Sequence, residues 1–157
     1  MTSFEFVSTD ESDLDKVRPL WEVLREHHQK KSIDFKIRYE KMSFNSRKAD
    51  LLKKLEHGKM RIDLALNPIT KEPVGYCINT IVYEPAPEGE IDSLLVQPDF
   101  RGNGIAEKLL NFAIEWFDSN NIVTRKIVVA AGNEEVFAFY KKFGFYHKFS
   151  TLEFKSL

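Results

Sequence analysis

The chain has little cysteine, no long apolar run and no excess of one charge, and each absence narrows what it can be. Its 157 residues include one cysteine, Cys77, which leaves no pair for an internal disulfide and no cysteine-rich metal site. No stretch of apolar residues approaches the roughly 20 that a membrane-spanning helix needs. The formal net charge is −1, so the chain lacks the basic balance typical of nucleic-acid-binding modules.

These absences favour a cytoplasmic protein. A single cysteine is typical of compartments that keep thiols reduced, and Cys77 is most simply a small buried residue of a strand. Residues 1–5 lack the basic and apolar regions of a secretory signal peptide. We therefore expect no membrane partner and no nucleic-acid partner.

The length of the chain, with 43% hydrophobic and 13% aromatic residues, suits a single domain over residues 1–157 with a sizeable core.

The hydrophobic pattern predicts several strands before a central helix and a strand-helix-strand unit after it. Strands are expected at residues 4–8, 61–66, 74–83, 90–96 and 125–131, with one or two more at 145–154. Helices are expected from Ser12, whose spacing to Asp15 is a weak capping box, through His28, then over 46–57 and from 104 to about 120. Residues 30–46 are expected to be loop with a helical turn. This order favours an α/β fold with a mixed sheet.

The most informative feature is the glycine turn that follows the strand 90–96. Gly102 and Gly104 let the backbone approach a ligand without a Cβ in the way, and the free N–H groups of the next helix point at the same place. A helix N-terminus carries about half a positive charge, so a diphosphate is the favoured ligand. A mere tight connection would need only one glycine.

Two common phosphate-binding loops do not fit this turn, because a Walker A loop needs Gly-Lys-Ser/Thr and a dinucleotide fingerprint needs three glycines. The pattern Arg/Gln-x-x-Gly-x-Gly/Ala does fit, with Arg101, Gly104 and Ala106 at its fixed positions. A second block, residues 133–145, follows Asn-x-x-Ala/Val-x-x-x-Tyr-x-x-x-Gly-Phe. Through these two blocks, residues 90–146 resemble the GNAT superfamily of acyl-CoA-dependent N-acetyltransferases.

The resemblance implies a fold and an activity. The fold is α/β, a GNAT-like mixed and mostly antiparallel central sheet flanked by helices, with strands that splay at the acetyl-CoA site. The activity is direct transfer of an acetyl group from acetyl-CoA to a primary amine of a small molecule, such as a polyamine or amino acid, or of a protein, with no metal. A homodimer through the late strands is implied by the resemblance alone. The alternative is a non-catalytic acyl-CoA-binding sensor or interaction domain of the same fold.

The resemblance also assigns residues to the co-substrate. Amides around residues 102–107 would cradle the pyrophosphate while Arg101 sets the loop, and amides at 94–96 would bind the pantetheine arm and polarise the thioester carbonyl. The predicted acetyl-CoA-binding residues are Leu94, Leu95, Val96, Arg101, Gly102, Asn103, Gly104, Ile105, Ala106, Glu107 and Asn133.

Three residues are predicted to be catalytic. Tyr140 occupies the tyrosine position of the family and would return a proton to the CoA thiolate; a phenol has a pKa of about 10 and an ordinary thiol about 8.5. The alternative is that Tyr140 is one more core aromatic.

Glu90 and Asp92 stand two apart on a strand and point to one face, where either would deprotonate the amine directly or through water. Asp92 falls where relatives often carry a glutamate. Both carboxylates are equally compatible with a solvated or salt-bridged surface.

Two features leave the function open. Residues 30–61 carry eleven lysines and arginines against four acidic residues, which indicates either a surface for an anionic partner or a solvated helix face. The four histidines have no spacing typical of a metal site and are interpreted as surface or cap residues, although His28 could face the substrate cleft. The aromatic and acidic tract at 21–28 suits a polyamine, but the sequence does not identify the amine.

Overall fold

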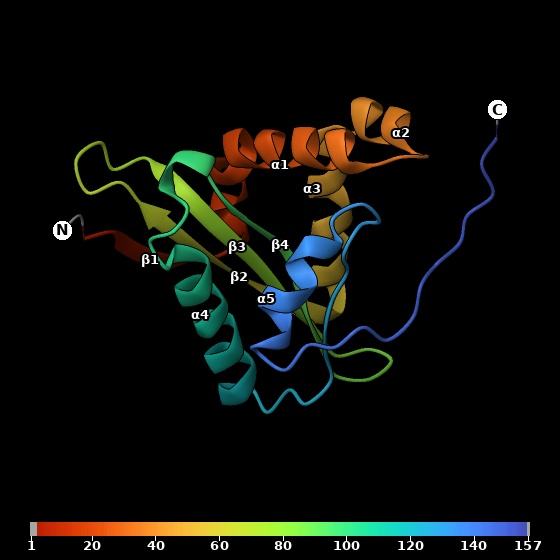
Figure 1. Cartoon of the computed structure of the whole chain (residues 1–157). Helices are drawn as coiled ribbons and strands as arrows, with labels where there is room; N and C mark the ends of the chain where they lie inside the picture. Colours follow the sequence, from red (N-terminus) through yellow and green to blue (C-terminus); the bar gives the residue numbers. More distant parts are fainter. Residues whose placement is uncertain (1–2, 157) are drawn as a thin grey trace.

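The computed structural model describes residues 3–156, and its centre is a five-stranded sheet with helices on both faces (Figure 1). The strands are β1 (Glu5–Thr9), β2 (Gly58–Leu66), β3 (Pro73–Val82), β4 (Glu88–Val96) and β5 (Arg125–Ile127). They lie in the order β1-β2-β3-β4-β5; the first four are antiparallel, and β5 joins β4 in parallel. The predicted mixed, mostly antiparallel sheet is therefore confirmed.

The helical segments come in three groups. Before β2 lie the 3-10 helix η1 (Glu11–Val17), α1 (Arg18–Lys31), α2 (Lys36–Lys41), α3 (Phe44–Lys53) and the 3-10 helix η2 (Lys54–His57). Between β4 and β5 lie η3 (Pro98–Phe100) and α4 (Ile105–Ser119), and after β5 lie η4 (Glu134–Val136) and α5 (Phe137–Lys141). Within residues 3–156, none of these helices has the length and apolar content needed to cross a membrane.

Each face of the sheet carries its own core. On one face, Trp21 of α1 and Leu51 of α3 pack against strand side chains such as Tyr76. On the other face, α4 packs against Cys77 and Ile91. Successive strand side chains point to opposite faces, so neighbours such as Tyr76 and Cys77 belong to different cores. Cys77 is buried, as predicted.

The prediction of a loop with a helical turn over residues 30–46 was right in part but underestimated the helix there. This segment holds the end of α1, all of α2 and the start of α3. The hydroxyl of Ser43 caps α3 by accepting the Ser46 amide at 3.1 Å, so this helix begins before the predicted residue 46. The first helix likewise begins on a cap by Asp10, which accepts the Ser12 amide at 2.9 Å. Several short polar side chains in each segment can cap a helix, so the sequence leaves open which of them does.

The late strands were also predicted wrongly. β5 ends at Ile127 rather than residue 131, and no strand forms over residues 145–156. Apolar and aromatic residues form a strand only if a hydrogen-bonding edge is available to them. Here the segment runs away from the sheet to the C-terminus (Figure 1). Ion pairs tie it to the region of α2 instead, from Arg38 to Glu153 and from Lys155 to Asp34.

Candidate active site

β4 and β5 pair along only part of their length. Their register runs from Gly89 opposite Arg125 to Ile91 opposite Ile127, and the two segments then separate. In the described part of the chain, no strand pairs with this edge of β4 beyond Ile91. Backbone N–H and C=O groups along such an edge are free to bind an extended ligand. The structure thus has the divergent strand pair that was predicted.

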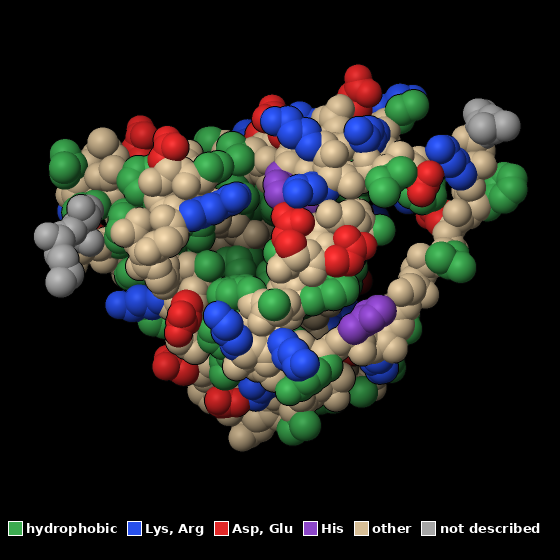
Figure 2. Space-filling model, viewed as in Figure 1, with side chains coloured by type: hydrophobic (Ala, Val, Ile, Leu, Met, Phe, Trp, Pro, Cys, Tyr) green, Lys and Arg blue, Asp and Glu red, His purple; other side chains and the backbone are tan. Residues whose placement is uncertain are grey.

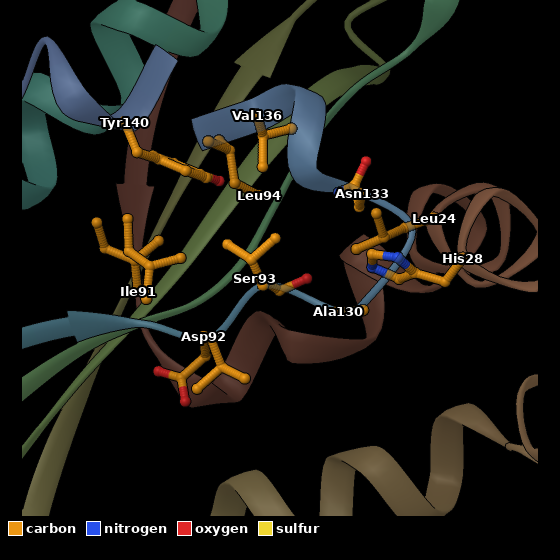
Figure 3. Close-up of a pocket in the computed structure, with 13 residues that line it drawn as sticks. Leu24, His28, Ile91, Asp92, Ser93, Leu94, Ala130, Asn133, Val136 and Tyr140 are labelled. Atoms are coloured by element: carbon orange, nitrogen blue, oxygen red, sulfur yellow. The ribbon is translucent and has the colours of Figure 1, made fainter. Parts of the chain in front are cut away.

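A small cavity lies where these strands diverge, and we call it the divergence cavity. Its volume is about 100 Å³, enough for a small acyl group and an amine but not for a nucleotide. It is lined by Leu24 and His28 of α1, residues 91–94 of β4, residues 127–130, Asn133, Val136 and Tyr140. Figure 3 shows these side chains approaching the cavity from both sides of β4. Figure 2 shows a hollow in this face of the molecule between α4 and α5, with hydrophobic side chains at its floor.

A β-bulge in β4 determines which side chains face the cavity. Ile78 pairs with Ser93 and the next residue, Asn79, pairs with Ile91, so Asp92 is an extra residue in β4. A bulge bends the strand and re-aims its side chains. As a result, Asp92 and Ser93 both lie toward the α1 and α3 face, where Ser93 Oγ is 2.7 Å from the Tyr76 hydroxyl. Leu94 packs on the opposite, α4 side.

Glu90 and Asp92 share one face, and both contact Lys54 of η2. Lys54 Nζ donates to Glu90 Oε1 at 3.1 Å and to Asp92 Oδ1. Thr80 Oγ1 donates to the second Asp92 oxygen at 2.7 Å. The Asp92 side chain is 0% exposed, and this burial raises its pKa while Lys54 lowers it. Both oxygens of Asp92 are therefore engaged, and the role of the two carboxylates as bases stays a prediction.

Part of the basic segment 30–61 turns inward at this site. Besides Lys54, Arg47 of α3 donates to the backbone carbonyl of Asp92 at 3.0 Å. These two cations hold the bulged part of β4 from the helical side. Sequence reasoning missed both, although Lys54 follows Leu51 by one helical turn and so lies near the buried stripe of α3.

Tyr140 approaches the cavity from α5. Its side chain belongs to the core on the α4 face, and its hydroxyl points toward Leu94 (Figure 3). Burial raises the pKa of Tyr140 well above its usual range, and the neighbouring Cys77 adds to the shift. The phenol is therefore protonated at neutral pH. Within residues 3–156 no hydrogen-bond partner is found for this hydroxyl, so its proton is free for a ligand.

The glycine turn has the backbone geometry that an anion site needs. Gly102 and Gly104 have φ of +81° and +74°, which favours glycine, and a Cβ at either position would meet nothing within 4 Å. Gly104 caps α4 without any side-chain hydrogen bond. In the described residues, the amides of residues 102–107 have no hydrogen-bond partner. Open space above a row of free donors fits the oxygens of a pyrophosphate.

Arg101 and Asn103 support the turn rather than fill it. Arg101 Nε donates to the Val96 carbonyl at 3.2 Å, and Asn103 Nδ2 donates to the Phe100 carbonyl at 2.9 Å. Both bonds tie the turn to the end of β4 and to η3. They leave the amides above free.

The remaining predicted co-substrate residues differ in what they expose. Leu94 lines the cavity, whereas Leu95, Val96 and Ile105 bury their side chains in the two cores. Those three can therefore serve a ligand only through their backbone. Ala106 and Glu107 contribute the first-turn amides of α4.

Asn133 lines the cavity and links two elements that are distant in sequence. Its Oδ1 is 3.1 Å from His27 Nε2, so it joins the start of η4 to α1. This bond occupies the amide oxygen and leaves the Asn133 amide nitrogen for a ligand.

His28 is the cavity residue that the sequence analysis left undecided. It lies one turn after Leu24 on α1, and its Nδ1 is buried without a hydrogen-bond partner in the described residues. Burial lowers the pKa of His28, and the neighbouring His27 lowers it further. The only sequence signal was its place on the apolar stripe of the first helix.

No cluster of three or more His, Cys, Asp or Glu side chains that could hold a metal ion is found among residues 3–156. The predicted absence of a metal stays a prediction.

The arrangement defines a class of ligand and of protein. An extended molecule can lie along the open edge of β4 with its phosphates on the glycine turn and its far end in the cavity beside a phenol. Comparison with known proteins agrees, because residues 21–145 match the model of the acetyltransferase (GNAT) family. The chain therefore belongs to the GNAT family of acetyl-CoA-dependent N-acetyltransferases.

Individual relatives show the same likeness. A stretch of 59 residues is 39% identical to an uncharacterized N-acetyltransferase of Methanocaldococcus jannaschii; it covers 38% of this chain and only 26% of that protein. A putative acetyl transferase from Pyrococcus furiosus has a TM-score of 0.69 at 22% identity, over 95% of this chain and 98% of its own. A GCN5-related N-acetyltransferase from Ralstonia eutropha has a TM-score of 0.73 at 17% identity, over 96% and 97%. At these identities the two structures show the fold alone.

Proposed function

We propose that the protein transfers an acetyl group from acetyl-CoA directly to a primary amine of a small molecule or of a protein. The observation that carries the proposal is the divergence cavity, which the hydroxyl of Tyr140 enters and which lies on the strand that leads into the glycine turn. One extended thioester can therefore reach from the turn to the cavity along β4.

The residues present fit acetyl-CoA. The free amides of residues 102–107 would hold the pyrophosphate, and the unpaired edge of β4 beyond Ile91 would hold the pantetheine arm. An amide near Leu94 that points at the acyl oxygen would polarise the thioester carbonyl, as donors in an oxyanion hole do. Acetyl-CoA supplies an activated acetyl group and a thiolate leaving group.

The reaction needs an acid at the sulfur and a neutral amine at the carbonyl. The amine nitrogen forms the new C–N bond as the C–S bond breaks, and Tyr140 gives its hydroxyl proton to the departing sulfur. The phenolate then takes up the proton that the new amide nitrogen loses, so Tyr140 is restored. Glu90 and Asp92 remain candidates to assist the amine, supported by their shared face beside the cavity.

The amine is the open part of the proposal. A panel of polyamines, amino acids, aminoglycosides and lysine or N-terminal peptides, assayed by release of the CoA thiol, tests it. We expect thiol release that requires both acetyl-CoA and an amine of the panel. If acetyl-CoA binds but no amine increases thiol release, the acyl-CoA sensor is the better account.

A homodimer belongs to the same proposal. It is supported by β5, which is an edge strand, and by exposed apolar side chains after α5, at Tyr146, Phe149, Leu152 and Phe154. Open strand edges and exposed apolar segments are typical interaction surfaces. Sedimentation equilibrium should then find a dimer that Leu152→Ser with Phe154→Ser weakens. A wild-type monomer at high micromolar concentration would contradict it.

Two broader expectations complete the proposal. A single domain over residues 1–157 is supported by the family match, which spans most of that length. A cytoplasmic location is supported by the free thiol of Cys77, which a reducing compartment preserves. Fractionation of cells that express the protein tests the location.

A further inference from the structure

His28 brings an uncommitted basic group to the divergence cavity. Its ring reaches from α1 to the cavity beside Leu24 and Ala130 (Figure 3). Its Nδ1 is buried and finds no hydrogen-bond partner in the described part of the chain. Buried polar atoms are normally paired, so an unpaired nitrogen on a ring that lines a cavity needs an explanation. A ligand that donates a hydrogen bond at this place supplies one.

The other titratable side chains of the cavity are already engaged or protonated. Asp92 accepts from Lys54 with one oxygen and from Thr80 with the other. Glu90, which lies next to it on the same face, also contacts Lys54. Tyr140 keeps its proton because it is buried. Among the described cavity residues, only His28 combines a basic ring with a buried nitrogen that has no hydrogen-bond partner.

The cavity also places the two titratable side chains, one for the proton of the amine and one for the sulfur, on opposite sides. His28 comes from α1, on one face of the sheet, and Tyr140 comes from α5, on the other (Figures 1 and 3). An amine adds to an acyl carbon between them, and the sulfur then leaves from the tetrahedral adduct. A base on the α1 side can serve the amine and an acid on the α5 side can serve the sulfur.

We propose that His28 is a catalytic residue that accepts the proton from the ammonium form of the acceptor amine. This inference rests on the proposed function. A primary ammonium gives one proton to the unprotonated ring nitrogen of neutral His28, and the resulting neutral amine attacks the acyl carbon. His28 then releases that proton to water. Tyr140 protonates the sulfur and regains a proton from the new amide, so the net products are the amide, the CoA thiol and one proton.

The surroundings of His28 keep it neutral at neutral pH. The titratable groups next to it are His27 on its own helix and Tyr39 of α2, and Asp92 of β4 and Tyr140 of α5 line the same cavity. Burial and His27 both lower the pKa of His28, and the Tyr39 ring lies at a tilt to its ring with centroids 5.6 Å apart. A neutral imidazole can accept a proton; an imidazolium cannot.

The test is His28→Gln, which keeps a polar side chain of similar size but cannot take up a proton near neutral pH. With a strongly basic amine at pH 7, we expect kcat/KM to fall by about 10² to 10⁴, the usual contribution of one general base. In wild type, kcat/KM should fall at low pH as His28 becomes protonated, and this part of the profile should be lost in His28→Gln. The matched control is His57→Gln, an exposed histidine of η2, which should behave as wild type.

A weakly basic amine separates proton transfer from a structural role. An aromatic amine is already neutral at pH 7, so His28→Gln should acetylate it at nearly the wild-type rate. Equal losses with both amines, or no loss with the basic amine, would overturn the inference. If the basic-amine loss appears instead in Asp92→Asn and not in His28→Gln, the base is the carboxylate.

Two further measurements keep the result unambiguous. The acetyl-CoA affinity and thermal midpoint of each variant check that it is folded. If His28→Gln does not fold, His28→Ala assayed with added imidazole replaces it, and rescue of basic-amine acetylation is expected. A wild-type enzyme that is inactive with every amine would refute the proposed function, whereas an active wild type with an unaffected His28→Gln would refute only the role of His28.

Discussion

Tyr140→Phe is expected to slow acetyl transfer by about 10² to 10⁴-fold, the usual contribution of one general acid, while acetyl-CoA still binds. The hydroxyl is the only group that the variant loses, so the packing of α5 on the core should be unchanged. The effect should appear in single-turnover transfer to the best amine of the panel. Acetyl-CoA affinity, measured by calorimetry, should match the wild type.

The raised pKa of Tyr140 is compatible with this role. Burial disfavours the phenolate, but it disfavours a CoA thiolate in the same cavity as well, so proton transfer between them is not impeded by burial alone. Tyr140 should keep its proton beyond the usual tyrosine pKa of about 10. The exposed Tyr146 provides the matched control as Tyr146→Phe. Wild-type turnover in Tyr140→Phe would leave Tyr140 as a core aromatic, and lost affinity with unchanged turnover would make it a co-substrate contact.

Gly104→Val should abolish the stabilisation of the protein by acetyl-CoA. A ligand that binds only the native state at a hundredfold excess over Kd adds about 2.7 kcal/mol to the free energy of unfolding, and this appears as a higher thermal midpoint. A valine side chain at residue 104 would fill the open space above the free amides of the turn. The midpoint of the variant should therefore not respond to acetyl-CoA.

A second glycine controls for backbone strain. Gly144 also has positive φ, at +90°, and a Cβ there would meet nothing within 4 Å. Gly144→Val carries the same kind of strain and should also lower the thermal midpoint without ligand, but it should keep the response to acetyl-CoA. If folded Gly104→Val shows the same acetyl-CoA-induced shift of the thermal midpoint as the wild type, the glycine turn does not bind the pyrophosphate.

The features that the sequence predicted well are local. The glycine turn and the helix after it are encoded by consecutive residues, and the predicted helix from 104 to about 120 is observed as α4, Ile105–Ser119. Backbone conformation at Gly102 and Gly104 depends on the absence of a Cβ, which is visible in the sequence. The positions of the first four strands along the chain were likewise predicted from their local hydrophobic pattern.

The features that the sequence did not predict depend on pairing between distant segments. The bulge at Asp92 exists only in the register of β4 against β3, and strict alternation gave no sign of it. The contacts of Lys54 with Glu90 and Asp92 join residues 36 and 38 positions apart. The place of His28 at the cavity follows from how α1 crosses β4, so periodicity located only the inner face of the helix.

The late strands were predicted wrongly for the same reason, because a strand depends on pairing with a distant segment. Residues 145–154 carry aromatic and apolar residues typical of strands, but the edge that would pair with them is not a property of their own sequence. β5 is short because its neighbour β4 diverges, and that divergence creates the cavity. The feature that made the strand prediction wrong therefore also makes the site.

The central claim is that acetyl-CoA lies along β4 with its phosphates on the glycine turn and its acetyl group in the divergence cavity. The most direct test is a crystal structure with a thioether analogue of acetyl-CoA that cannot transfer its acyl group. We expect pyrophosphate oxygens within hydrogen-bond distance of the amides of residues 102–107, and the acyl oxygen in the cavity between Leu94 and Tyr140. A pyrophosphate bound away from the turn, or an acyl group outside the cavity, would contradict the account.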